Sequence, residues 1–201
     1  MIYIKDDFLD LELFNTLWDQ IDLDNFTNIE VPTGTKDYDL IINYHPVPLK
    51  FIKYLVKWLS IIEDADIESI ACFIRKATDT IDTNWQIHND GYIQGQKPDR
   101  ACVLYLSDTQ LKELHGTAFW SHVEHGEYFN DLSNVKEYDK LIKEDFNNIE
   151  KWDLKSVIGY KKNRLISYPS NYFHSKYPNQ AWETGRIALI MFYKSTNSLK
   201  L

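Results

Sequence analysis

The feature that most constrains the fold is a series of short β-type segments in the last two thirds of the chain. Each segment is rich in β-branched and aromatic residues, and Asn, Asp, Gly or Pro separates it from the next. The segments are 67–75, 85–88, 101–106, 116–122, 157–161, 164–168 and 186–193. Several strands at this spacing predict a sandwich or barrel of the jelly-roll kind. The aromatic fraction of 14% also favours a sheet over a helical bundle as the core.

Helical periodicity is concentrated before these strands. A short strand at 1–5 precedes a helical pattern from Leu9 to about Ile21, and an amphipathic pattern runs from Pro48 to Glu63. Pro48 suits a helix start, where its missing N–H has no partner to lose. These helices are expected to support a sheet.

The chain has 201 residues, which is the size of one well-cored domain. We therefore expect a single domain over 1–201, with an N-terminal support over 1–65 and a β core over 66–195. A stretch near 135–152 has helical spacing of its apolar residues and interrupts the strands as a helical insertion.

Charge and cysteine usage restrict the partners and the compartment. The net charge of −8 repels phosphate backbones, so nucleic acid is disfavoured as a partner. Cys72 and Cys102 lie in apolar β-like runs and are expected to be buried free thiols in a reducing compartment. The N-terminus lacks the pattern of a signal peptide, and no apolar run reaches the roughly 18 residues of a membrane span. The sequence therefore predicts a cytoplasmic protein without a membrane segment.

A histidine and a carboxylate stand two residues apart in His88-Asn89-Asp90. Residues i and i+2 of a strand point to the same face, so both side chains would face one cavity. A further histidine, His174, follows a late strand and a Pro-containing turn. Two histidines and one carboxylate leave three positions open on a metal, an arrangement that suits Fe(II) with a chelating co-substrate and dioxygen.

Arg186 begins the apolar strand 186–193, where a charge is costly unless it has a partner. A guanidinium can bind a carboxylate through two parallel hydrogen bonds. Arg186 follows His174 by 186 − 174 = 12 positions, enough for a turn and a return to a neighbouring strand. The combination is more specific than any of its parts.

Together, His88-x-Asp90, His174 and Arg186 resemble the pattern of the 2-oxoglutarate/Fe(II) oxygenase superfamily, with a layout close to its prolyl-4-hydroxylase-like branch. The resemblance covers roughly 67–194 and is strongest in Asn163-Arg-Leu-Ile-Ser-Tyr-Pro-Ser-Asn-Tyr-Phe-His174. It implies a mainly β fold with supporting helices and a double-stranded β-helix (jelly-roll/cupin-like) core.

The resemblance also implies a site and a reaction. His88, Asp90 and His174 would be the catalytic Fe(II) ligands, and Arg186 would hold the distal carboxylate of the co-substrate 2-oxoglutarate. A C–H bond would be hydroxylated with release of succinate and CO2, and ascorbate is an optional reductant. Asp90 stands where halogenating relatives have a small residue, which favours hydroxylation.

The chain departs from the family pattern at three places. His115-Gly116 replaces the usual Gly-Gly pair, and Arg186 replaces the lysine of prolyl hydroxylases, although other branches use arginine. Ala188 stands where some branches have a serine after the arginine. A hydroxyl for the co-substrate must then come from elsewhere, and Tyr105 is our candidate.

Other readings remain open on the sequence alone. His115, His122 and His125 form a rival histidine cluster, although an i, i+3 pair on a strand points to opposite faces. Trp85 and Trp120 either wall the cavity or belong to the core. A non-catalytic β-barrel binding protein with a metal site is the main alternative. A zinc hydrolase would need a general base, and no Glu has a suitable spacing.

The sequence does not define the substrate or the oligomeric state. A protein side chain, a peptide and a small metabolite fit the acidic, aromatic-rich composition equally well. The N-terminal 60 residues and the stretch 135–152 are expected to cover the substrate, because loops on a rigid barrel usually carry specificity.

Overall fold

The computed structural model describes residues 1–32, 39–77, 84–108, 115–129, 135–179 and 185–196. Its helices and strands follow in the order β1 (Tyr3–Lys5), α1 (Leu11–Trp18), β2 (Thr27–Pro32), β3 (Asp39–Pro46), α2 (Leu49–Glu63), β4 (Asp66–Ala77), β5 (Arg100–Tyr105), β6 (Gly116–His122), α3 (Val135–Glu144), the 3-10 turn η1 (Ile149–Lys151), β7 (Trp152–Gly159), β8 (Leu165–Pro169), β9 (His174–Tyr177) and β10 (Arg186–Thr196).

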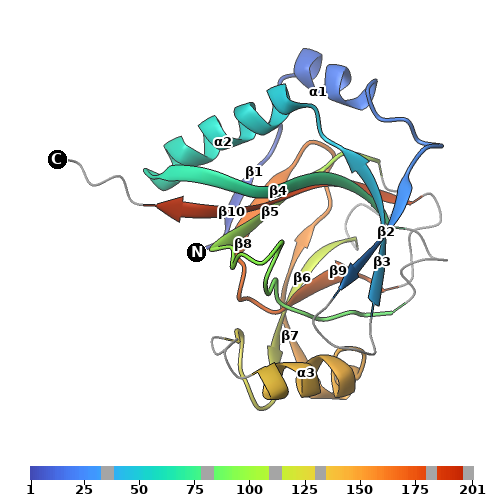
Figure 1. The fold of residues 1–201 in the computed structure, drawn as a ribbon, viewed down its shortest axis with the longest axis vertical. Coiled ribbons are helices and arrows are strands. Elements are labelled where there is room, and N and C mark those ends of the chain that lie inside the picture. Colours follow the sequence, from blue (N-terminus) through green and yellow to red (C-terminus); the bar gives the residue numbers. More distant parts are fainter. Residues whose placement is uncertain (33–38, 78–83, 109–114, 130–134, 180–184, 197–201) are drawn as a thin grey trace.

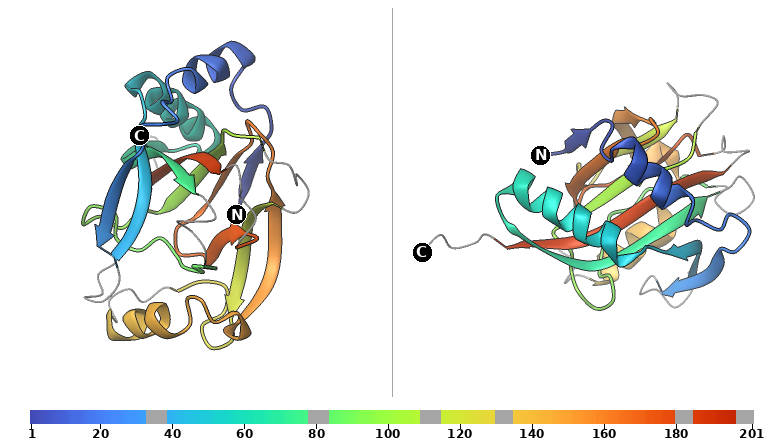
Figure 2. Two further views of the ribbon diagram at one scale, coloured as in Figure 1. Left: turned by 90° about the vertical axis from the view of Figure 1, so that its right-hand side faces the viewer. Right: turned by 90° about the horizontal axis from the view of Figure 1, so that it is seen from above.

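The strands form two antiparallel sheets. The large sheet has seven strands in the order β1-β8-β5-β10-β4-β3-β2, and the small sheet has three in the order β7-β6-β9. Figure 1 shows α1 and α2 above the large sheet, and α3 beyond β7 on the far side of the small sheet. Figure 2 shows the same layers from two further directions. The mainly β fold with supporting helices is therefore confirmed.

Strand parity divides the large sheet into two apolar faces. On β10, Ile187, Leu189 and Met191 pack toward α1 and α2, whereas Ala188 and Phe192 face the small sheet. A third cluster, which includes Trp120 and Leu141, fills the space between the small sheet and α3. The site described below lies on the inner side, between the two sheets.

The N-terminal support contains more strand than the sequence analysis predicted. β2 and β3 pair with each other, and β3 pairs with β4, so both extend the large sheet. β1 pairs with β8 at the other edge. The apolar pattern of these short segments is too irregular to predict strands. Pairing with other segments of the chain stabilises them instead.

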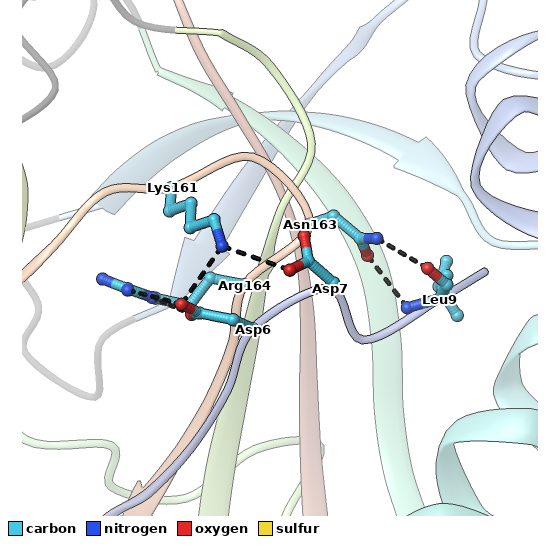
Figure 3. Close-up of polar contacts among 6 residues, drawn as sticks. All are labelled: Asp6, Asp7, Leu9, Lys161, Asn163 and Arg164. Atoms are coloured by element: carbon cyan, nitrogen blue, oxygen red, sulfur yellow. Dashed lines mark hydrogen bonds and ion pairs between the residues drawn. The ribbon is translucent and has the colours of Figure 1, made fainter. Parts of the chain in front are cut away.

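Polar contacts fasten the N-terminal segment to the turn before β8 (Figure 3). Arg164 donates to both carboxylate oxygens of Asp6, at 2.6 and 3.0 Å. The side chain of Asn163 bonds both the backbone N–H and the carbonyl of Leu9, at 3.0 and 2.7 Å. The Arg164 hydrogen bonds lower the pKa of Asp6 to about 2. The segment before α1 is therefore held against the strand that leads to His174.

Gly116 at the start of β6 has a steric reason to be glycine. A Cβ there would lie 2.1 Å from the carbonyl oxygen of Ile158, on the paired strand β7. This close backbone approach explains the glycine that follows His115.

The two cysteines are unpaired, with Cys102 buried and Cys72 partly buried. Among the described residues, no helix is long and apolar enough to span a membrane.

Candidate metal and co-substrate site

Three predicted residues meet between the sheets. His88 and Asp90 lie in the connection from β4 to β5, and His174 is the first residue of β9. One ligand atom of each lies within 4.8 Å of the others, and no other such group of three occurs in the described part of the chain. The Asp90 carboxylate oxygens lie 3.9 Å from His88 Nε2 and 3.7 Å from His174 Nε2. Neighbouring ligands bound about 2.1 Å from one metal ion are separated by about 3–4 Å.

The backbone that holds this triad differs from the predicted strand at 85–88. That prediction is wrong, because Gln86 has a φ of 50°, outside the extended range. Only an isolated bridge joins His88 to His174, with N–H···O distances of 3.0 and 2.8 Å. Asp90 N–H donates to the Ser170 carbonyl at 2.8 Å. The same-face placement of His88 and Asp90 thus comes from contacts with the segment around β9.

Backbone carbonyls fix the tautomer of both imidazoles. His88 Nδ1 lies 2.7 Å from the Gln86 carbonyl oxygen, and His174 Nδ1 lies 2.9 Å from that of Tyr172. A carbonyl can only accept a hydrogen bond, so each Nδ1 carries the proton and each Nε2 keeps its lone pair. Metal-binding histidines are commonly oriented in this way.

Burial sets the charge of the three groups. It lowers the pKa of His88 and of His174 to about 4, and it raises the pKa of Asp90 to about 6. Near pH 7 the site therefore holds two neutral imidazoles and a carboxylate. Asp90 Oδ2 is buried and has no hydrogen-bond partner among the described residues. A buried carboxylate oxygen without a donor is costly, and a cation between the three groups would satisfy it. The donor set fits a divalent metal.

The stretch 135–152 forms hydrogen bonds with the loop that carries His88 and Asp90. The Phe146 carbonyl accepts a hydrogen bond from Ile87 N–H, and Asn147 Oδ1 accepts one from Gln86 N–H, both at 3.0 Å. The Tyr138 hydroxyl donates to the Asn89 carbonyl at 3.4 Å. The prediction of a helical excursion is confirmed by α3 and the 3-10 turn that follows it. In the described residues this excursion positions the loop that carries His88 and Asp90.

Arg186, the fourth predicted residue, lies beside hydroxyl groups. Arg186 Nη2 donates to Thr117 Oγ1 at 3.1 Å, and the guanidinium lies over the Tyr105 ring, 5.3 Å from its centre. The Tyr105 hydroxyl lies 2.7 Å from the same Thr117 oxygen. Arg186 is also one of the charges that lower the pKa of His174, after burial. The structure therefore places Arg186 and Tyr105 together, within electrostatic range of the triad.

Sequence reasoning missed three residues of this site. Thr117 lies on the inner face of β6, and its alternation with Phe119 could have indicated this. Tyr168 lies on the inner face of β8 with its ring 4.7 Å from that of His174, centre to centre. Arg75 pairs with Ala188 across β4 and β10, and its charge acts on the titration of all three triad residues. The local sequence does not mark Arg75 as a site residue, because its place depends on the register between β4 and β10.

The rival histidine cluster is a set of structural contacts. His122 Nε2 lies 3.2 Å from Asp145 Oδ2, and its Nδ1 accepts from the Glu124 N–H at 3.2 Å. The rings of His122 and His125 stack, with centres 4.9 Å apart. Burial, and then the charge of Arg186, lower the pKa of His115. The three histidines do not form a common ligand set in the described residues.

The two tryptophans belong to the core behind the small sheet. Trp120 is buried with Phe173 and Leu141, and its indole N–H donates to Ser175 Oγ at 2.9 Å. The Trp85 ring packs edge-on against Trp120, with centres 5.5 Å apart. Phe119, the neighbour of Trp120, faces the triad side. Alternation along β6 therefore excludes Trp120 from the cavity wall.

Comparison with known proteins places the fold among non-heme 2-oxoglutarate-dependent enzymes. No family model and no curated protein matches the sequence. Solved structures do match. The α-ketoglutarate-dependent carbocyclase SnoK from nogalamycin biosynthesis has a TM-score of 0.60 at 10% identity, over 99% of this chain and 83% of SnoK. AviO1 from Streptomyces viridochromogenes Tue57 has a TM-score of 0.57 at 11% identity, over 96% of this chain and 89% of AviO1.

A third similar structure was solved with ligands. HygX from Streptomyces hygroscopicus with nickel and 2-oxoglutarate bound has a TM-score of 0.56 at 11% identity, over 96% of this chain and 82% of HygX. Similarity at this level of identity establishes the fold. The double-stranded β-helix core is thereby confirmed, whereas nothing in it distinguishes the prolyl-4-hydroxylase-like branch.

Proposed function

We propose that this protein is an Fe(II)- and 2-oxoglutarate-dependent oxygenase. The observation that carries the proposal is the convergence of two Nε2 lone pairs and one unpartnered carboxylate oxygen, with Arg186 nearby. The three groups come from two separate segments, and each is held in the protonation state that a divalent metal requires. The fold shared with SnoK and HygX supports the same assignment.

His88, Asp90 and His174 would hold the iron and leave three positions for the co-substrate and dioxygen. Arg186 is suited to the distal carboxylate of 2-oxoglutarate, because a guanidinium binds a carboxylate through two hydrogen bonds. Thr117 would orient the guanidinium through the hydrogen bond at 3.1 Å. Tyr105 would hold both groups in place, through the contact of its ring with Arg186 and the hydrogen bond of its hydroxyl with Thr117.

When bound, iron and 2-oxoglutarate would supply, together with dioxygen, an oxidant for a C–H bond, and the co-substrate would leave as succinate and CO2. The protein contributes position and exclusion of water. Phe119 and Tyr168 pack against His174, with ring centres at 6.5 and 4.7 Å. These rings would shield the His174 side of the site from solvent.

The reaction we favour is hydroxylation, because Asp90 keeps the third ligand that a halogenating site gives up. The layout of the four residues supports a prolyl-4-hydroxylase-like arrangement. SnoK is a carbocyclase, so this fold also accommodates ring formation. Of the substrate classes we place small molecules first, since HygX has also been solved with hygromycin B bound. Peptides and protein side chains are the second class to test.

Two free cysteines, Cys72 and Cys102, support a reducing compartment, and burial raises the pKa of the Cys72 thiol to about 12. A thiol that stays protonated reacts slowly with oxidants. We therefore propose a cytoplasmic location.

The test is succinate formation from 2-oxoglutarate with Fe(II) and ascorbate, over a panel of small molecules and peptides. The panel should contain at least one compound that stimulates turnover in the wild type and leaves Asp90→Ala inactive. Stimulation that survives Asp90→Ala, or that does not require Fe(II), would contradict the assignment. Binding of panel compounds without any succinate would favour the non-catalytic binding protein.

A further inference from the structure

The inner face of the large sheet has a covered half and an open half. The inner-face residues of β5 are buried against the small sheet: Ala101, Val103 and Tyr105. The inner-face residues of β4 are only partly buried: Ala71, Phe73 and Arg75. In the left view of Figure 2, β2 and β3 in blue lie across the interior from β6 and β7. The small sheet therefore leaves the β4 side of this face accessible.

Aromatic rings line the open half and continue to the triad. The Phe73 ring lies 5.7 Å from that of Tyr44 on β3 and 6.2 Å from that of Phe192 on β10, between centres. Phe192 belongs to the same apolar cluster as Tyr168, whose ring lies 4.7 Å from that of His174. An apolar wall thus runs from the triad to β3, and it would suit the ring or hydrocarbon body of a substrate.

A second arginine, Arg75, lies on this open half. It pairs with Ala188 of β10 and with Tyr44 of β3, so its side chain projects on the same face as theirs. Phe73, two residues earlier on the strand, packs on that face as well. Arg75 therefore places a positive charge at the edge of the apolar wall.

Arg75 and Arg186 serve different parts of the inner face. Arg186 is the diagonal neighbour of Arg75, two residues before Ala188, and such neighbours are about 7–8 Å apart. The Arg186 guanidinium contacts Thr117 of β6 and the Tyr105 ring of β5, on the covered half. Like charges at this spacing repel, so each arginine would be stabilised by an anion of its own. One anion is the 2-oxoglutarate carboxylate proposed for Arg186.

We propose that Arg75 binds an anionic group of the primary substrate, a carboxylate or a phosphate, while the apolar body of the substrate lies on Phe73 and Phe192. A guanidinium has five N–H donors, so it can bind an anion in addition to contacts within the protein. The proposal rests on the oxygenase assignment and names its substrate class, a small organic anion with an apolar ring or chain. The body would extend from Arg75 toward the triad.

Matched probes test the proposed preference for an anion. Each set consists of an arylacetate, the aryl phosphate and the neutral arylacetamide, with phenyl and 2-naphthyl as the two ring sizes. Binding is measured by calorimetry on metal-free protein. In at least one set, an anion should bind at least about tenfold more tightly than the amide, the range for hydrogen bonds to a charged group. The anion that binds more tightly distinguishes a carboxylate from a phosphate substrate.

Three variants locate the preference. Arg75→Gln should lower the affinity for the anion at least about tenfold and leave the affinity for the amide unchanged. Lys76→Gln is the matched control and should change neither, because its ammonium donates to the Leu23 carbonyl at 3.1 Å and lies over the Phe26 ring, on the opposite face. Phe73→Ala should weaken the anion and the amide by the same factor.

Equal affinities for anion and amide in the wild type, or no binding of any probe, would overturn the proposal. An equal loss in Lys76→Gln would do the same. Loss of the preference in Arg186→Gln but not in Arg75→Gln would place the probe at the co-substrate position and would also overturn it. The measurement needs no iron. A retained anion preference in protein that shows no charge-transfer band would therefore contradict the oxygenase assignment and leave the anion site in place.

Discussion

Two clusters of histidine and acidic side chains lie on opposite faces of the small sheet. On the inner face, His88 and His174 direct Nε2 toward Asp90 at 3.9 and 3.7 Å, too far for hydrogen bonds. On the other face, His122 bonds Asp145 directly at 3.2 Å and accepts from a backbone N–H through its second nitrogen. Both nitrogens of His122 are thus engaged within the protein.

This difference shows what separates a metal site from a structural cluster of similar composition. In the triad, Nδ1–H of each histidine donates a hydrogen bond to a backbone carbonyl, which leaves the Nε2 lone pair available. In the cluster around His122, the protein satisfies both nitrogens, and the bond to Asp145 ties β6 to the end of α3. Composition predicts both clusters equally, whereas the hydrogen-bond partners distinguish them.

The largest expected effect is the loss of metal binding in His174→Ala. Substituting only an outer-shell partner of a metal typically costs about 10–100-fold in affinity, so removal of a ligand should cost more than about 100-fold. The measurement is Fe(II) affinity by anaerobic equilibrium dialysis. His122→Ala is the matched control and should bind Fe(II) as the wild type does. The reverse pattern would assign the metal to the other cluster.

The second expected effect concerns the guanidinium beside the triad. Arg186→Ala removes the proposed partner of a carboxylate, and truncation of a buried, hydrogen-bonded charge partner costs about 2–5 kcal/mol. The 2-oxoglutarate affinity of the Fe(II)-loaded protein should therefore fall by at least about 30-fold, measured by calorimetry under anaerobic conditions. Fe(II) affinity without 2-oxoglutarate should be retained. An unchanged 2-oxoglutarate affinity would place the co-substrate elsewhere.

A third prediction reverses the comparison by disturbing the structural cluster. Asp145→Asn weakens the contact with His122 and should lower the free energy of unfolding by about 1–3 kcal/mol. Urea denaturation of the metal-free protein measures this loss. Fe(II) affinity at a protein concentration where the variant is folded should not change. A selective loss of metal affinity with unchanged stability would refute the structural role.

The smallest expected effect is a difference in acid sensitivity. His88 and His174 have pKa values near 4 in the folded chain, against about 6.5 when unfolded. Between these values the unfolded state binds more protons, so their contribution to stability is full above about pH 6.5 and is lost as the pH falls toward 4. The raised pKa of Asp90 changes stability with pH in the opposite direction, but this is one carboxyl group against two imidazoles.

His174→Gln should therefore flatten the decline in unfolding free energy of metal-free protein between pH 6.5 and 5. His122→Gln should flatten it less, because the hydrogen bond to Asp145 opposes the lowering of the His122 pKa by burial. The measurement is urea unfolding at the two pH values. Equal slopes in wild type and His174→Gln would show that this imidazole does not titrate differently on folding.

Much of the fold follows from local pattern. The segments that became β5, β6, β8 and β10 are apolar on both faces because each lies between two packed layers, and such runs are recognisable. The helices have periodic apolar faces, for example Phe51, Leu55 and Leu59 of α2. β2 and β3 were missed because their pairing, rather than their composition, defines them: β2 is the edge strand, and β3 lies between β2 and β4.

The candidate site likewise has parts that the sequence predicts and parts that it does not. The spacing of His88 and Asp90 predicted their common direction correctly, although the reason was wrong, since Gln86 interrupts the extended backbone. Thr117 and Tyr168 could be found by strand parity once their neighbours were assigned. The carbonyls of Gln86 and Tyr172, which fix the tautomers, carry no side-chain signal. Arg75 depends on register between distant strands and has no local signature.

The central claim is that His88, Asp90 and His174 bind iron together with 2-oxoglutarate. The most direct measurement is the visible absorption spectrum of anaerobic protein with Fe(II) and 2-oxoglutarate. We expect a charge-transfer band in the wild type and in His122→Ala, and no band in His174→Ala. A metal-replete wild type without the band, or a band that persists in His174→Ala, would contradict the claim.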